Sequence, residues 1–134
     1  CYLKGVDLKN ALNQVLPAVS DDDSKPILCG VNFIISDDNY VELCATNRYK
    51  LVWKLILKEG DNDFGENYEF IIHKDIVKEL LRIINEDDTV YVSYNKNLVR
   101  FEVPGVSIIA RIIDGKFPDC RSLIAKAFSK PKLF

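Results

Sequence analysis

The chain has 134 residues, of which 48% are hydrophobic and 28% are charged, and its net charge is −2. This composition is that of a globular domain, and a chain of this length can bury one core without help from disulfides or metals. Its apolar runs are far shorter than the roughly 20 residues of a membrane-spanning helix, and no secretory signal opens the chain. We therefore expect one intracellular domain over residues 1–134. It is not a strongly basic nucleic-acid binder, although this net charge is compatible with a local basic face.

The cysteines and the histidine give no sign of a metal site. Cys1, Cys29, Cys44 and Cys120 form no C-x-x-C pair, and His73 is the only histidine. These residues cannot supply a standard zinc set at motif spacing, so we interpret the cysteines as reduced and expect no metal or other cofactor. The chain begins at Cys1 and contains no Met, which indicates a piece of a longer protein.

The first half of the chain predicts one helix and several strands. Apolar residues recur at helical spacing from Leu8 to Leu16, with Asp7 as a candidate cap and Pro17 near the end, which predicts an amphipathic helix of about three turns. A short apolar entry precedes it. Segments rich in β-branched and aromatic residues follow and predict strands; they are 27–35, 40–46 and 49–57.

The second half repeats this order of elements. Residues 60–67 form a polar, glycine-bearing stretch that we interpret as the link between halves 1–60 and 61–134. A strand at 68–72 and an amphipathic helix at 76–84 come next, and three more strands follow, at 89–94, 98–103 and 106–113. Two β-α-β-β-β units predict an α+β architecture, with an antiparallel sheet and two helices side by side on one face.

The motifs of common enzymes are missing. The sequence contains no G-x-x-x-x-G-K-[ST] loop, no G-x-G-x-x-G turn and no G-x-S-x-G elbow, which are the usual frameworks for phosphate binding and nucleophilic hydrolysis. His73 precedes the second helix, where a surface role is typical, and the acidic residues gather mainly in loops. We expect no catalysis. An enzyme acting through His73 and a nearby carboxylate is the alternative that we retain.

The second predicted helix carries a basic stripe. Lys74, Lys78 and Arg82 follow one another at intervals of four residues and so lie along one side of the helix. Lys9 gives the first helix a weaker counterpart. Such a face could contact phosphates without reading bases, but a solvated helix face has the same appearance, and two acidic residues of the second helix partly neutralise the stripe.

Three segments together carry a resemblance to a known family. They are K-P-I-L-C-G-V at 25–31, A-T-N-R-Y-K-L at 45–51 and I-D-G-K-F-P-D at 113–119. In this order, and over nearly the whole chain, they resemble the central domain of the DNA polymerase III beta subunit, the bacterial sliding clamp. The beginning of the second helix, His73-Lys74, is similar to that family as well.

The resemblance implies the DNA-clamp fold and a ring-shaped processivity factor without catalysis of its own. Family members have three such domains per chain and close as head-to-tail homodimers around duplex DNA, with helices lining the pore. The residues that this implies to face DNA are Lys9, Lys25, Lys74, Lys78 and Arg82. It also implies a cytoplasmic protein that associates with the nucleoid during replication.

The resemblance further implies a hydrophobic cleft that captures short peptides through Leu and Phe anchors. Its partners would be the replicative polymerase, the clamp loader and repair proteins. The matching residues are Leu28, Thr46, Arg48, Tyr49, Lys50, Leu51, Pro118, Ser122 and Leu123. The apolar members of this set could instead be ordinary core residues.

Departures from the family pattern leave the peptide preference open. Arg48 stands where the family usually has a small residue, Lys50 replaces Arg, and Ser122 often matches a basic residue. The terminal pair Leu133-Phe134 resembles the tail of a clamp-binding peptide, although a link to a following domain is the simpler interpretation. A protein-interaction module of the same fold that does not encircle DNA is the alternative function.

Overall fold

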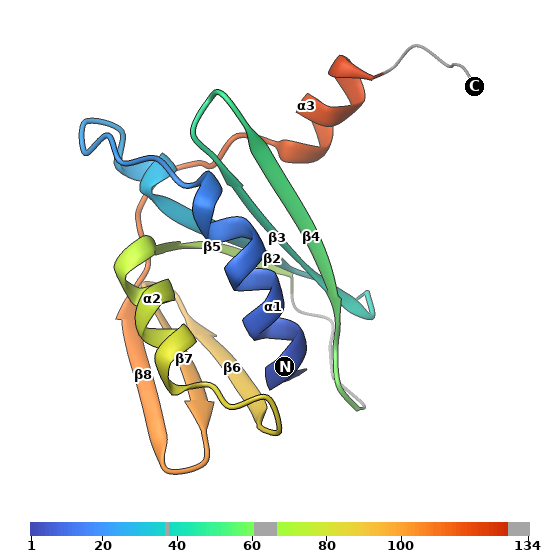
Figure 1. Cartoon of the computed structure of the whole chain (residues 1–134), viewed down its shortest axis with the longest axis vertical. Coiled ribbons are helices and arrows are strands. Elements are labelled where there is room, and N and C mark those ends of the chain that lie inside the picture. The colour runs from blue at the N-terminus through green and yellow to red at the C-terminus, as the bar shows by residue number, and fades with distance from the viewer. Residues whose placement is uncertain (37, 61–66, 129–134) are drawn as a thin grey trace.

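The structure is a computed structural model that describes residues 1–36, 38–60 and 67–128. Its helices and strands, labelled in Figure 1, are β1 (Tyr2–Lys4), α1 (Gly5–Val15), β2 (Gly30–Ile35), β3 (Tyr40–Thr46), β4 (Leu51–Leu57), β5 (Tyr68–His73), α2 (Lys74–Ile83), β6 (Thr89–Asn95), β7 (Leu98–Val103), β8 (Val106–Arg111) and α3 (Cys120–Ala127). Short 3-10 helices cover Leu16–Ala18 and Pro26–Cys29. The predicted α+β class and the order of the first ten elements are confirmed. The predicted link and the Leu133-Phe134 pair lie mostly or wholly outside the described residues.

Several element boundaries differ from the sequence prediction for local reasons. The strand predicted from residue 27 begins at Gly30, because Pro26 starts a 3-10 helix that occupies the preceding residues. Gly30 lies so close to β5 that a Cβ atom on it would be 2.4 Å from the Ile72 carbonyl oxygen, so only glycine fits there without movement of the backbone. The strand predicted from residue 49 begins at Leu51, after a turn.

The strands form two antiparallel sheets, whereas we expected one. The sheet orders are β1-β6-β7-β8 and β4-β3-β2-β5. The first strand of each half therefore joins the sheet of the other half: β1 pairs with β6, and β5 pairs with β2. The two halves are interlocked by these pairings.

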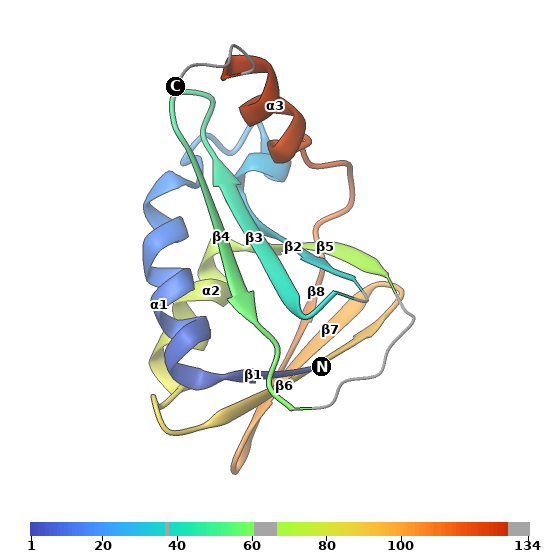
Figure 2. The same cartoon turned by 90° about the vertical axis from the view of Figure 1, so that its right-hand side faces the viewer.

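The helices α1 and α2 contact each other and cover one side of the two sheets, as expected (Figures 1 and 2). The side chains of Leu8, Leu12 and Leu80 are fully buried against the strands. In the middle of this core, Phe33 stacks on Phe70 with 5.1 Å between ring centroids. Fully burying one such aliphatic or aromatic side chain contributes about 1.5–3 kcal/mol, so the shared core joins both halves energetically as well as topologically.

The helix α3 was not predicted, and it docks beside the β3–β4 hairpin (Figure 2). Cys120, its first residue, forms a disulfide with Cys44 of β3. The expectation that all cysteines are reduced was therefore wrong for this pair. The two cysteines are 76 residues apart, a spacing that matches no recognisable cysteine motif. Only the docking of α3 brings the two sulfur atoms together.

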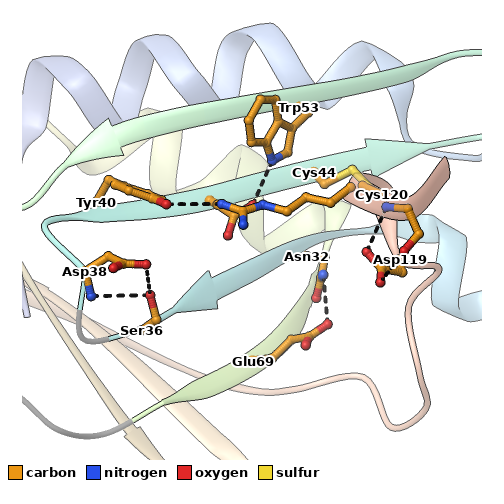
Figure 3. Close-up of polar contacts among 12 residues, drawn as sticks. Asn32, Ser36, Asp38, Tyr40, Cys44, Trp53, Glu69, Asp119 and Cys120 are labelled. Atoms are coloured by element: carbon orange, nitrogen blue, oxygen red, sulfur yellow. Dashed lines mark hydrogen bonds and ion pairs between the residues drawn. A yellow bond between two sulfur atoms is a disulfide. The ribbon is translucent and has the colours of Figure 1, made fainter. Parts of the chain in front are cut away.

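An ion pair between the exposed Arg121 and the buried Glu42 also holds α3 on the sheet. Arg121 Nε donates to Glu42 Oε1 at 2.7 Å, and Arg121 Nη2 donates to the Tyr40 hydroxyl at 3.1 Å (Figure 3). Trp53 Nε1 donates to the same Glu42 oxygen at 3.0 Å. Glu42 is only 6% exposed, and a buried carboxylate is strongly destabilising without such donors. Arg121 therefore couples the position of α3 to the outer face of β3.

A small second core fills the space beneath α3. It is separate from the main core and consists of Leu28, Cys44, Ile71, Phe117 and Cys120. Phe117 is only 3% exposed, which anchors the segment that leads from β8 to α3. This segment is also fixed at its start, where the Ile113 amide donates to the Ile71 carbonyl at 2.9 Å.

We expect reduction of the Cys44–Cys120 disulfide to loosen α3 selectively. A disulfide that closes a long loop typically stabilises a protein by about 2–4 kcal/mol, and here the loss falls on a short helix with one other strong anchor. Hydrogen exchange of the full-length protein should show faster exchange of the α3 amides in a phosphine reductant, while exchange in α1 stays unchanged. A Cys44→Ala/Cys120→Ala variant should exchange quickly at α3 with or without reductant. Identical protection of α3 in all four samples would contradict this prediction.

Candidate functional site

A cleft of about 620 Å³ opens where α3, the β3–β4 turn and the loop before β2 meet. Its floor is apolar, and the outermost residues are polar or cationic. The residues that line it are Ser24, Lys25, Pro26, Ile27, Leu28, Thr46, Arg48, Tyr49, Lys50, Leu51, Lys116, Pro118 and Leu123. Concave sites of this size with an apolar floor and a few polar groups are typical of ligand and peptide binding.

The β3–β4 turn is held in one shape by two side chains. Thr46 Oγ1 accepts from the Arg48 amide at 3.2 Å and donates to the Lys50 carbonyl at 2.8 Å. Asn47 Oδ1 accepts from the amides of Tyr49 and Lys50, each at 3.0 Å. Arg48 has φ of 81°, a left-handed conformation that costs a non-glycine residue about 1–3 kcal/mol. The turn is therefore preorganised, and it places Arg48, Tyr49 and Lys50 at the cleft.

The opposite wall of the cleft comes from α3. Asp119 caps this helix: its carboxylate accepts from the Ser122 hydroxyl at 2.9 Å and from the Ser122 amide at 3.2 Å. These hydrogen bonds lower the pKa of the Asp119 carboxyl below its usual value. Leu123, one residue further on, is 45% exposed and lines the cleft. The cap therefore helps to fix the helix that presents Leu123.

The structure brings together all but one of the residues predicted for the cleft. Ser122 is the exception, because its hydroxyl turns to Asp119 and the residue does not line the cleft. Leu28 is 8% exposed and belongs to the second core as well as to the cleft floor. The exposure of Leu123 shows that it is not a core residue. Whether peptides bind here stays a prediction at this point.

Sequence reasoning missed several lining residues. Ser24, Pro26, Ile27 and Lys116 were not predicted, although all four lie in or beside the segments that carry the family resemblance. Lys25 was predicted to face DNA, and its side chain lines the cleft and pairs with Asp22 at 3.5 Å. These residues could have been found because they are close in sequence to positions that match the family's peptide cleft. Residues between two cleft positions of one loop usually approach the same cavity.

The cations predicted on the helix face differ in whether they form ion pairs. Lys74 Nζ donates to Asp21 at 3.1 Å, and this hydrogen bond raises the pKa of the Lys74 ammonium. Arg82 donates to Glu79 at 2.6 Å. For Lys9 and Lys78, no ion pair forms within the part of the chain that the structure describes. The basic stripe is thus present, but two of its members are already paired.

His73 has a structural task at the beginning of α2. Its Nδ1 accepts a hydrogen bond from the Asp75 amide at 3.1 Å and so caps the helix. In this geometry the Nδ1 lone pair is occupied.

Among the described helices, none has the length and apolar character needed to cross a membrane.

Comparison with known proteins places this chain in a family. The family model for the DNA polymerase III beta subunit, central domain, matches residues 2–119. A beta sliding clamp from Staphylococcus aureus is 32% identical over 123 residues, which are 90% of this chain and 31% of that protein. A beta sliding clamp from Streptococcus pneumoniae is 28% identical over 123 residues, covering 91% of this chain and 32% of its own length.

A solved structure agrees with these relatives. The crystal structure of the DNA polymerase sliding clamp from Bacillus subtilis superposes with a TM-score of 0.82 at 27% identity, over 91% of this chain and 32% of that one. The chain therefore belongs to the DNA polymerase III beta subunit family and matches its central domain. It spans about a third of the length of the relatives that it matches.

Proposed function

We propose that the full-length protein is a sliding clamp, a ring-shaped processivity factor that holds a replicative polymerase on duplex DNA. In this proposal residues 1–134 are one of three similar domains, and the ring closes as a homodimer in the cytoplasm. The observation that carries the proposal is the cleft: residues from three separate segments that resemble the family's peptide site line one apolar cavity. The proposal includes no catalytic step and no cofactor.

The helix pair would face DNA. The helices α1 and α2 lie side by side on one face of the domain, and Lys9 and Lys78 form no ion pair with a described acidic side chain. Lys74, Arg82 and Lys25 would add weaker contacts, since each shares its charge with an acidic partner. A few such contacts to phosphates are independent of base sequence. A ring must slide, so weak contacts suit this function better than tight ones.

The cleft would dock partner proteins. Leu28, Leu51 and Leu123 provide apolar surface on which the Leu and Phe side chains of an extended peptide can be buried. Buried apolar anchors of this kind usually supply most of the energy of a small interface. The polymerase, the clamp loader and repair proteins are the partners that we propose for this site.

Removal of the unpaired helix cations should lower the salt dependence of DNA binding. Each lost phosphate contact reduces the slope of log K against log salt by about 0.9, so a full-length Lys9→Gln/Lys78→Gln variant should show a shallower slope between about 50 and 200 mM salt. Fluorescence anisotropy with a labelled duplex measures this. The control is Lys96→Gln/Arg100→Gln, which removes two charges from the β6–β7 hairpin, one of them paired with Glu102 at 3.7 Å. An unchanged slope in the first variant would favour an interaction module that does not encircle DNA.

Charge introduced into the cleft should weaken peptide binding strongly. Replacing a central anchor contact typically costs about 2 kcal/mol or more, which is about thirty-fold in affinity. We expect both Leu51→Asp and Leu123→Asp in the full-length protein to weaken a Leu-Phe peptide by at least this factor in a fluorescence titration. Leu98→Asp, at a similarly exposed leucine on β7, should bind like the unmodified protein. If all three variants bind equally, the cleft is not the docking site.

A further inference from the structure

The cleft has a cationic rim on a protein that is acidic overall. Among the residues that the structure describes, four basic residues and no Asp or Glu line the cleft, while the whole chain has a net charge of −2. The basic character is therefore local to this cavity. It is not a consequence of composition.

Three of these cations have no acidic partner. Lys25 is paired with Asp22, but Arg48, Lys50 and Lys116 form no ion pair within residues 1–36, 38–60 and 67–128. We call Arg48, Lys50 and Lys116 the rim cations. Arg48 and Lys50 are exposed on the preorganised β3–β4 turn, and Lys116 is exposed on the segment that leads to α3. The rim cations thus approach the cavity from two elements.

The backbone of Arg48 also has an unusual conformation. The left-handed φ of 81° favours glycine or asparagine at this position, yet the position holds a long cationic side chain. Strained residues persist where the surrounding structure enforces them, and they cluster at binding sites. Here Thr46 and Asn47 enforce the turn, and they fix the backbone position from which the Arg48 side chain extends beside the cleft.

We infer that the preferred occupant of the cleft is an acidic peptide, with Asp or Glu residues on both sides of its apolar anchors. The inference rests on the proposed docking function and specifies the partner's chemistry. The apolar floor takes the anchors, and the rim cations attract the flanking carboxylates. The phosphates of a nucleic acid could pair with the rim cations, but they would leave the floor formed by Leu28 and Leu51 without an apolar partner. A peptide with apolar anchors and acidic flanks complements both the floor and the rim.

The expected preference can be estimated from exposed ion pairs. A solvent-exposed contact between a carboxylate and a cation changes affinity by about two- to five-fold. Two or three such contacts together predict about ten-fold tighter binding of an acidic peptide than of a neutral one. The preference should shrink in strong salt, because the screening length falls from about 10 Å at 0.1 M to about 3 Å at 1 M.

The test compares two nonapeptides with the same central Leu-Phe pair. One has Asp and Glu in its flanks and the other has Asn and Gln at the same positions, so the peptides differ in charge but hardly in shape. Fluorescence titrations use the full-length protein and two variants of it. The first is Arg48→Asn/Lys50→Gln/Lys116→Gln, in which Asn keeps the left-handed turn accessible. The second, Lys96→Gln/Arg100→Gln, removes cations elsewhere.

The acidic peptide should bind about ten-fold more tightly than the neutral one to the unmodified protein and to the second variant. In the first variant, and at about 1 M salt, this ratio should fall toward one. Equal binding of the two peptides by the unmodified protein at low salt would overturn the inference and leave the docking function intact. Binding of neither peptide would overturn both. A first variant that loses affinity for duplex DNA while the peptide ratio is one throughout would assign the rim cations to nucleic acid.

Discussion

The two halves exchange their first strands, and this pairing determines how the sheets, the shared core and the cleft are arranged. Because β1 completes the sheet of the second half and β5 completes that of the first, neither half can bury its apolar face alone. The contacts of Phe33 with Phe70 and with Phe101 lie where the two sheets share their core. The exchange also sets α1 beside α2 on one side and leaves β4 at a sheet edge, with its turn available to build a site.

The cleft depends on a second, smaller set of contacts, which lie at the end of the β4-β3-β2-β5 sheet where the β3–β4 turn is. The disulfide from Cys120 and the ion pair between Arg121 and Glu42 fix α3, and the second core supports the segment before it. The side chains of Thr46 and Asn47 fix the opposing turn. Both walls of the cavity are thus held by contacts that form without a ligand, which reduces the entropy lost on binding.

Local patterns in the sequence predicted most elements but not their partners. The apolar spacing from Leu8 to Leu16 and within residues 76–84 predicted the buried sides of two helices, because burial repeats with the period of the helix. The β-branched and aromatic segments predicted the strands. Alternation fixes which side of a strand is buried and not which strand lies next to it, so the division into two sheets was missed. The short helix α3 has only one buried residue, Cys120, and its pairing with Cys44 depends on tertiary structure alone. The cleft residues were found through resemblance, while Lys116 was missed because no periodic pattern marks a loop residue.

A crystal structure of the full-length protein with the neutral Leu-Phe nonapeptide bound would show directly whether the cleft docks peptides. We predict that the Leu and Phe side chains of the peptide lie between Leu28 and Leu51 on one side and Leu123 on the other. We also predict that the β3–β4 turn keeps the hydrogen bonds made by Thr46 and Asn47. A peptide bound elsewhere on the molecule, with this cleft empty, would contradict the docking function.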